Sequence, residues 1–285
     1  MPKQTDITYT TPEQPRQLRL DTVGNKCNAG CLSCHRFLST RAGELPSELF
    51  NQILGDVSRW QIPLTEVIPV NYGELFMRKD WLWILEVLSQ KLPKTQIVLP
   101  TNGSLLTEDI IKSLCGIPTL RIINFSLNAF FEETYEKFNL LKAENLVKIE
   151  KYMHLVKVLR PDITLWASMV FSPEYQSDLE RDMFIKKWMG LAYPQILTAS
   201  SAGRGTQVKI LRSKPCRSIF SDIVIGYDGK LSSCCFDPAF SAFDLGFYSG
   251  DLRKDWSNSQ FQEFRRLHNE GLRQEISLCR ECTFE

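Results

Sequence analysis

The sequence has almost no excess charge and no long hydrophobic run. Its 34 lysine and arginine residues nearly balance 33 aspartate and glutamate residues, which leaves a net charge of +1. No global field therefore favours nucleic acid or an anionic membrane as a partner. The most apolar helical stretch, residues 81–88, is far too short to cross a bilayer. We expect neither a nucleic-acid-binding protein nor a membrane protein.

The N-terminal residues do not form a recognisable export signal. Residues 1–16 are polar, contain three prolines and lack the apolar segment of a secretory signal. Nine cysteines in such a chain are typical of metal ligation in a reducing compartment rather than of disulfides. We therefore predict a cytoplasmic protein that uses most of its cysteines as metal ligands.

The remaining composition is that of an ordinary folded protein of the α/β class. Hydrophobic residues make up 43% and charged residues 24% of 285 residues. Short β-branched runs alternate with helical patterns, which is typical of repeated βα units and a parallel sheet. Six strands are expected near residues 17–23, 66–71, 95–100, 121–127, 163–170 and 195–200. Five helices are expected near 47–60, 81–91, 108–115, 144–159 and 178–189.

Six units are too few to close an eight-unit barrel, so we expect an open arc with a lateral mouth. The pattern predicts a tail over residues 1–16, a partial barrel over 17–202 and a small C-terminal domain over 203–285. That last region shows a hairpin over 223–235 and an amphipathic helix over 259–268. It is too small for an independent core and would need the barrel or a metal to hold it.

Three cysteines stand within eight residues, directly after the first expected strand: Cys27, Cys31 and Cys34. Each thiolate of a 4Fe-4S cube binds one iron, so three ligands leave the fourth iron open to a small molecule. The alternative is a zinc knuckle in which His35 completes a tetrahedral site. Because His35 follows Cys34 directly, that site would need an unusually tight loop. The spacing favours an iron–sulfur cluster with one open iron.

The C-x3-C-x2-C loop resembles that of the radical S-adenosylmethionine (radical SAM) superfamily. The resemblance implies a partial (β/α)6 barrel in which the open iron chelates the amino and carboxylate groups of SAM. It also implies reductive cleavage of SAM to a 5'-deoxyadenosyl radical, which abstracts hydrogen from an unactivated C–H bond. In α/β folds ligands bind at the carboxyl ends of the strands, where this loop is expected.

A second set of cysteines lies in the C-terminal region. Cys216 is followed after twelve residues by Gly229, after four more by Cys234, and much later by a C-x2-C pair. This spacing resembles the Twitch form of the SPASM/Twitch extension of radical SAM enzymes. The resemblance implies an auxiliary 4Fe-4S cluster, the second in the chain, with the ligands Cys216, Cys234, Cys279 and Cys282. The alternative is a zinc ribbon, since four-cysteine sites also hold small domains together.

Cys235 directly follows the implied ligand Cys234. Successive side chains of a strand point to opposite faces, so Cys235 would face away from a cluster bound by Cys234. Radical SAM epimerases use such a cysteine to give a hydrogen atom to a carbon radical, and the resemblance implies that role for Cys235. The alternatives are that Cys235 is simply buried, or that it is the ligand and Cys234 is spare.

The segment after the second strand resembles the G-G-E-P motif of the same family. It reads Asn71-Tyr72-Gly73-Glu74-Leu75, with Tyr72 in place of the first glycine and leucine in place of proline. The resemblance implies that this segment binds SAM. Gly73 would let the backbone approach the methionine moiety, and Glu74 would accept a hydrogen bond from its ammonium group.

Further SAM contacts are implied where the third and fourth strands end: Asn102, Ser126 and Asn128. Ser126 and Asn128 are two residues apart and would share one face of a strand. Turn and capping chemistry is the alternative role for these residues. Ser33 stands where the family commonly has an aromatic residue, so packing of the adenine at that position is not implied.

The resemblance implies an epimerase that acts on a polar small molecule, such as an aminoglycoside or aminocyclitol, with a peptide as the alternative substrate. A flavodoxin- or ferredoxin-type reductant would supply electrons. A second candidate is a dehydrogenase that oxidises a secondary alcohol with the auxiliary cluster as electron acceptor; it needs a base but no thiol donor. From a different class, an iron–sulfur electron carrier or a zinc-binding module would not use the open iron.

Overall fold

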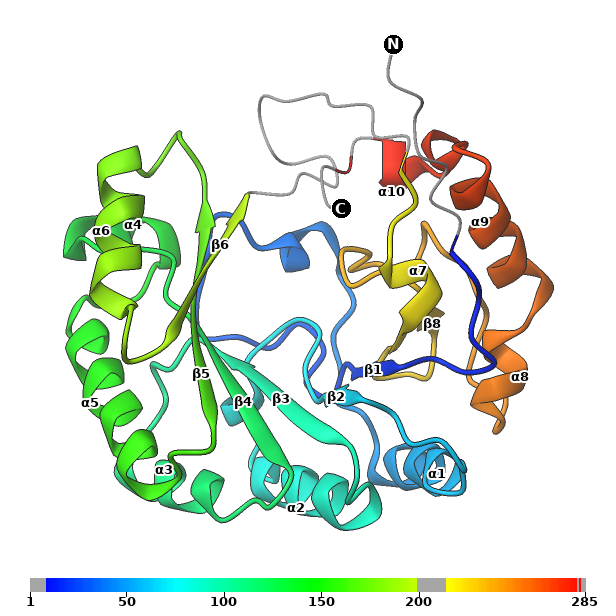
Figure 1. Ribbon diagram of the computed structural model, residues 1–285, viewed down its shortest axis with the longest axis horizontal. Helices are drawn as coiled ribbons and strands as arrows, with labels where there is room; N and C mark the ends of the chain where they lie inside the picture. The colour runs from blue at the N-terminus through cyan, green and yellow to red at the C-terminus, as the bar shows by residue number, and fades with distance from the viewer. Residues whose placement is uncertain (1–8, 199–213, 281, 283–285) are drawn as a thin grey trace.

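The computed structural model describes residues 9–198, 214–280 and 282 (Figure 1). Six strands alternate with helices and run parallel in the order β6-β5-β4-β3-β2-β1. They are β1 (Gln17–Leu20), β2 (Glu66–Ile68), β3 (Gln96–Thr101), β4 (Leu120–Ser126), β5 (Thr164–Phe171) and β6 (Tyr193–Thr198). The open arc seen in Figure 1 confirms the predicted partial (β/α)6 barrel.

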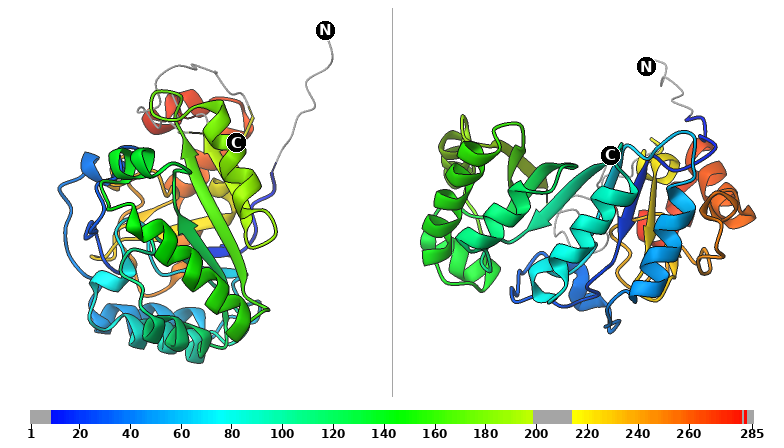
Figure 2. Two further views of the ribbon diagram at one scale, coloured as in Figure 1. Left: turned by 90° about the vertical axis from the view of Figure 1, so that its left-hand side faces the viewer. Right: turned by 90° about the horizontal axis from the view of Figure 1, so that it is seen from below.

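Helices cover the convex face of the arc, as Figures 1 and 2 show. They are α1 (Ser47–Val57), α2 (Trp81–Lys91), α3 (Glu108–Cys115), α4 (Glu132–Asn139), α5 (Glu144–Leu159) and α6 (Asp178–Trp188). Their apolar side chains and those of the strands form one continuous buried core. Burial of each such side chain contributes roughly 1.5–3 kcal/mol, so this layer accounts for much of the fold's stability.

Helix α4 has no counterpart among the five predicted helices. Its sequence, EETYEKFN, is mostly polar, and only Tyr135, Phe138 and Asn139 are buried. Tyr135 and Phe138 are three residues apart and therefore share one helix face. Contacts with the rest of the fold, rather than a long apolar stripe, stabilise this short helix.

The C-terminal region continues the same sheet. Strand β7 (Asp222–Ile225) pairs in parallel with β1, and β8 (Leu231–Ser232) pairs antiparallel with β7. Four helices complete the region: α7 (Ser218–Ser221), α8 (Leu252–Trp256), α9 (Ser259–Asn269) and α10 (Ser277–Arg280). The predicted hairpin and amphipathic helix are therefore present, and the barrel sheet holds the hairpin in place.

Residues 9–16, which belong to the predicted tail, pack against this C-terminal region. The Tyr9 ring stacks on Phe220 with 5.3 Å between centroids. The Trp256 indole donates a hydrogen bond to the Pro12 carbonyl at 2.9 Å. The predicted linker around residues 202–205 lies outside the described residues. In the described part of the chain, no helix has the length and apolarity needed to span a membrane.

Candidate functional site

The three-cysteine loop lies directly after β1, at the carboxyl ends of the parallel strands. It is anchored to the end of α4, because Gly30 N–H donates to the Asn139 carbonyl at 3.0 Å and Leu32 N–H to the Phe138 carbonyl at 2.9 Å. A Cβ on Gly30 would lie 2.7 Å from the end of the Leu140 side chain, so a larger residue would require that side chain to move. The unpredicted helix α4 thus positions the loop.

The three thiols of this loop lie close enough to interact electrostatically. Burial, together with the neighbouring thiols of Cys34 and Cys27, raises the pKa of Cys31 to about 12. Burial likewise raises the pKa of Cys27, while the hydrogen bond from the Ala29 N–H and the Arg36 guanidinium act to lower it. Such thiols lose their protons when a bound metal supplies positive charge. The donor set is therefore suited to metal binding.

Three thiols on one loop match the ligand number of a cluster with one open iron. Among the residues that the structure describes, no three Cys, His, Asp or Glu side chains converge as the ligands of one metal ion. A cube spreads its thiolates over several irons, whereas zinc gathers them at about 2.3 Å around one centre. The His35 ring packs against Phe236, with 5.4 Å between centroids. This contact connects the loop to the C-terminal region.

Asn102, at the end of β3, holds the loop from the other side. Its side-chain Nδ2 donates to Asn28 Oδ1 at 3.0 Å and lies 3.8 Å from the Cys27 sulfur. Asn28 in turn donates to the Ser104 hydroxyl at 2.7 Å. Asn102 therefore contacts the protein around Cys27 and can orient that thiolate.

Gly73 adopts a φ of +101° and approaches the three-cysteine loop closely. A Cβ there would lie 2.5 Å from the Lys26 carbonyl oxygen and 2.7 Å from Val23. The next residue, Glu74, donates its N–H to that same carbonyl at 2.8 Å. The glycine is thus required for contact between two backbone segments of the protein.

We expect Gly73→Ala to destabilise the chain by roughly 2 kcal/mol or more, since it combines a disfavoured φ with overpacking. Gly55→Ala is the matched control, because Gly55 lies inside α1 with nothing within 4 Å of the added Cβ. That change should stabilise by about 0.4–1 kcal/mol. Urea unfolding of both variants measures the difference, and a Gly73→Ala midpoint equal to the wild-type one would contradict the structure.

Glu74 is fully buried between the second and third strands. Its carboxylate accepts hydrogen bonds from the Thr101 hydroxyl at 3.0 Å and from the Asn102 N–H at 2.7 Å. Burial nevertheless raises its pKa to about 7. The carboxylate is thus a buried acceptor whose charge would be stabilised by a nearby cation.

This raised pKa predicts a pH dependence of stability. Between about pH 4.5 and 7 the folded state keeps a proton that the unfolded state releases, so stability falls as the pH rises through this window. The expected loss is about 3 kcal/mol for a shift of this size. Glu74→Gln should flatten that part of the profile, whereas Glu48→Gln, on the exposed side of α1, should leave it unchanged. Urea unfolding of the metal-free chain at pH 5 and 7 tests this. The same change in the free energy of unfolding between the two pH values in the wild type, Glu74→Gln and Glu48→Gln would refute it.

Ser126 and Asn128 do not share a strand face. Strand β4 ends at Ser126, and Asn128 has a left-handed φ of +61°, so the expected alternation stops before it. Asn128 Nδ2 donates to Asn139 Oδ1 at 2.8 Å, and its Oδ1 accepts the Val170 N–H at 3.0 Å. Both side-chain atoms of Asn128 therefore already have protein partners, whereas Ser126 is half-buried at the strand end.

The four predicted auxiliary ligands surround one cavity in the C-terminal region. Its lining includes Cys216, Cys234, Cys279 and Cys282, together with Cys235. Burial raises the pKa of Cys279 to about 12, as it raises that of Cys216. The structure therefore brings together the cysteines that the spacing singled out.

Cys234 and Cys235 lie beyond the end of β8, in a turn, so the strand alternation expected for them does not apply. Strand β8 ends at Ser232, and in the segment that follows the Asp237 carboxylate accepts the N–H of Ala242 and Phe243 at 3.1 Å. The two thiols nonetheless have different surroundings. Burial raises the pKa of both thiols; beyond that, Cys279 and Cys216 act on the pKa of Cys234, whereas Arg19 on β1 and Asp222 on β7 act on that of Cys235 ahead of Cys216.

Tyr72 joins the two cysteine sets. Its hydroxyl donates a hydrogen bond to the Cys235 carbonyl at 2.6 Å. Cys34, Cys234 and Cys235 all lie close enough to raise the pKa of Tyr72, although burial is the largest cause. With the contact between His35 and Phe236, this hydrogen bond places Cys235 at the boundary between the two cysteine sets.

Several residues that the sequence did not single out belong to these sites. Both amide atoms of the Asn71 side chain are buried without a hydrogen-bond partner, directly before Tyr72. Arg273 and His268 line the auxiliary cavity. They lie on α9 and η3 (Arg273–Glu275), shortly before Cys279 and Cys282 in the sequence but about fifty residues after Cys216. No local motif marks them.

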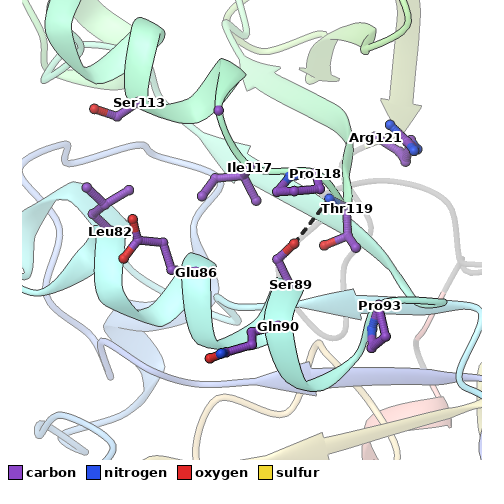
Figure 3. Close-up of a pocket in the computed structure, with 11 residues that line it drawn as sticks. Leu82, Glu86, Ser89, Gln90, Pro93, Ser113, Ile117, Pro118, Thr119 and Arg121 are labelled. Carbon is purple, nitrogen blue, oxygen red and sulfur yellow. Dashed lines mark hydrogen bonds between the residues drawn. The ribbon is translucent and has the colours of Figure 1, made fainter.

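A second hollow lies at the opposite end of the barrel. Figure 3 shows it between α2, α3 and the start of β4, with Ser89 accepting a hydrogen bond from the Thr119 N–H at 3.3 Å. The amino end of β4 contributes Arg121. Since ligands of such folds bind at the carboxyl ends of the strands, this hollow is not part of the site described above.

The SPASM family, described as an iron-sulfur cluster-binding domain, matches residues 216–283. No curated protein matches the sequence. The fold is similar to that of BtrN, solved in complex with AdoMet and 2-DOIA, with 15% identity over 97% of this chain and 94% of that one and a TM-score of 0.67. It is also similar to Streptococcus suis SuiB bound to precursor peptide SuiA, with 11% identity over 93% and 71% and a TM-score of 0.65.

A third similar structure is anSMEcpe with bound AdoMet and the Cp18Cys peptide, with 15% identity over 93% of this chain and 88% of that one and a TM-score of 0.64. These similarities concern the fold, and the family match concerns the region that holds the auxiliary cysteines. The chain therefore has the radical SAM fold with a C-terminal iron-sulfur domain of the SPASM/Twitch type, as its cysteine spacing predicts.

Proposed function

We propose that the chain is a radical SAM enzyme that epimerises a carbon centre of a polar small molecule, with Cys235 as the hydrogen-atom donor. The observation that carries this proposal is the position of Cys235 at the boundary between the two cysteine sets, next to Tyr72. When bound, SAM and its cluster supply a 5'-deoxyadenosyl radical that takes a hydrogen atom from a substrate C–H bond. The protein's residues bind these groups and supply the returning hydrogen atom.

Cys27, Cys31 and Cys34 would hold the SAM-binding cluster. Glu74 would bind the SAM ammonium, because a cation stabilises a buried carboxylate whose pKa is raised to about 7. The unpaired amide of Asn71 offers one donor and one acceptor at the same motif.

The remaining SAM-binding residues are proposed in supporting roles. Tyr72 and Gly73 would shape the SAM-binding segment. Asn102 would orient the Cys27 thiolate, whose sulfur its side chain approaches. Ser126 would contact SAM through its hydroxyl at the end of the strand. Asn128 would act indirectly, by stabilising the turn that follows.

The auxiliary 4Fe-4S cluster would be held by Cys216, Cys234, Cys279 and Cys282, which leaves Cys235 as a free thiol. Its S–H bond breaks homolytically as the hydrogen atom moves to the substrate radical, forming a C–H bond on the opposite face. The resulting sulfur-centred radical returns to the thiol by taking one electron and one proton. A flavodoxin- or ferredoxin-type reductant supplies the electron and solvent supplies the proton, so the reaction is redox-neutral for the substrate.

A row of polar side chains on the concave face supports a hydroxyl- or amine-rich substrate. The Ser168 hydroxyl donates to Asn124 Oδ1 and lies 3.2 Å from Gln195 Oε1. These residues belong to β4, β5 and β6, on the face opposite the buried Ile123 and Phe125. BtrN was solved with the small molecule 2-DOIA, which fits this proposal, whereas SuiB and anSMEcpe were solved with peptides.

A dehydrogenase that oxidises a secondary alcohol is the second candidate. Its support is the Asp222 carboxyl, which burial gives a raised pKa and which lies near Cys235 and Arg19. Such a carboxylate could take the alcohol proton, while the auxiliary cluster accepted the electron. Peptide epimerisation, electron transfer by an iron–sulfur carrier and zinc binding are further candidate functions. We further propose a cytoplasmic location, since metal-binding thiols require a reducing compartment.

The test uses anaerobically reconstituted protein with SAM and dithionite in deuterated solvent. The substrates offered are 2-DOIA and a panel of aminoglycosides and aminocyclitols. Epimerisation predicts 5'-deoxyadenosine together with a product of unchanged oxidation state that carries one deuterium at the inverted carbon. A ketone without deuterium would instead establish the dehydrogenase. Absence of 5'-deoxyadenosine from protein with full iron would overturn the radical SAM proposal.

A further inference from the structure

Arg273 is a buried cation in the auxiliary cavity. Its side chain is 2% exposed, and Nη1 donates to the Lys214 carbonyl at 3.0 Å. Nε and Nη2 are buried without any hydrogen-bond partner. Within the described part of the chain, no carboxylate forms an ion pair with Arg273. Because buried charges are normally paired, these two N–H groups require a partner of negative charge.

The same cavity holds two other polar groups. Ser233 lines it, is 2% exposed, and has a buried hydroxyl without a partner. His268 Nδ1 accepts the Cys216 N–H at 3.0 Å, so the proton of the neutral ring is on Nε2. That Nε2 lies 3.6 Å from the Cys279 sulfur, within reach of an N–H···S hydrogen bond. Donors therefore gather around the thiol groups of this cavity.

An iron–sulfur cluster held by the four thiolates of this cavity would supply the negative charge that these donors require. Hydrogen bonds to its sulfurs and its net charge set its reduction potential. Since reduction adds negative charge, a buried guanidinium favours the reduced form. The Arg273 charge already acts on the thiols of Cys216 and Cys279.

We propose that Arg273, through its free Nε–H and Nη2–H, and His268, through Nε2–H on the Cys279 sulfur, raise the reduction potential of the auxiliary cluster. This inference rests on the proposed function, because it assumes that cluster. It assigns Arg273 and His268 as residues that tune the auxiliary cluster without binding its iron. A raised potential makes this cluster easier to reduce.

The test measures the auxiliary cluster alone, in a full-length variant in which Cys27, Cys31 and Cys34 are replaced by alanine. Redox titration followed by electron paramagnetic resonance gives its midpoint potential. Arg273→Met keeps the length of the side chain and removes its charge and donors. We expect the equilibrium constant for one-electron reduction to fall at least tenfold, which is a shift of about 59 mV to more negative potential. Arg273→Lys, which keeps the charge, should shift it less.

Arg265→Met is the matched control. Arg265 is also buried in the C-terminal region, at 3% exposure, and donates to the Ile219 and Trp256 carbonyls. It packs over the Trp256 ring and does not line the cavity, so its removal should leave the potential unchanged. With 15N-arginine in the protein, the reduced cluster should also show a nitrogen hyperfine coupling that Arg273→Met abolishes and Arg265→Met keeps.

An unchanged potential in Arg273→Met with full iron would overturn this inference and leave the proposed function intact. If that variant binds no iron, Arg273→Gln, which removes the charge but keeps a polar side chain, decides, since a potential equal to that of Arg265→Gln would overturn the inference. If the parent variant without the first three cysteines binds no iron, both the auxiliary cluster and this inference fail.

Discussion

Replacing Cys27, Cys31 and Cys34 together by alanine is expected to abolish 5'-deoxyadenosine formation and to halve the iron content of the reconstituted protein. The iron falls by half because the auxiliary cavity keeps its own four cysteines. The activity disappears because SAM cleavage needs the open iron of the cluster that these three thiolates would hold. Iron quantification and chromatography of SAM incubations measure the two effects.

Cys115→Ala provides the matched control for this triple change. Cys115 is the last residue of α3, half-buried, on the convex side of the barrel. Its carbonyl accepts a hydrogen bond from Arg160 at 2.8 Å, and this backbone contact survives the substitution. Iron content and SAM cleavage should therefore equal those of the wild type. If the triple variant kept its full iron, or if the wild type bound zinc, the assignment of the open cluster would be wrong.

The sequence predicted the barrel and both cysteine sets because these depend on local patterns. The six strands and five of the helices follow the alternation of β-branched runs and helical stripes. The cysteines are recognisable because metal ligation restricts both residue type and spacing. Helix α4 was missed because its eight residues carry only a short buried face, formed by Tyr135 and Phe138.

The contacts between distant segments could not be predicted from spacing. Tyr72 and Cys235 are 163 residues apart, yet they share a hydrogen bond. Gly73 was expected to approach SAM, and the structure adds a different reason for glycine, which is contact with the backbone of residue 26. Asn128 lies in a left-handed turn that strand alternation does not foresee. Arg273 carries no motif, and its two buried, unpaired donors together with its place in the wall of the cysteine cavity identify it.

The two adjacent cysteines of the C-terminal turn should respond in opposite ways to substitution. Cys234→Ala is expected to lose the auxiliary iron, because Cys234 lies near Cys279 and Cys216. Cys235→Ala is expected to keep the iron of both clusters, because Arg19 and Asp222 act on its thiol more strongly than Cys216 does. Iron quantification of the two variants tests which cysteine is the ligand, and the opposite pattern would exchange their roles.

Cys235→Ala should also separate radical formation from product formation. Since the thiol acts after hydrogen abstraction, 5'-deoxyadenosine still forms, while epimerised product and its solvent deuterium fall to background. Cys235→Ser should behave in the same way, because its stronger O–H bond does not give a hydrogen atom to a carbon radical. Mass spectrometry of the product in deuterated solvent measures the loss. Undiminished deuterium incorporation in Cys235→Ala would exclude this thiol as the hydrogen-atom donor. A ketone product that Cys235→Ala forms at the wild-type rate would favour a dehydrogenase with Asp222 as the base.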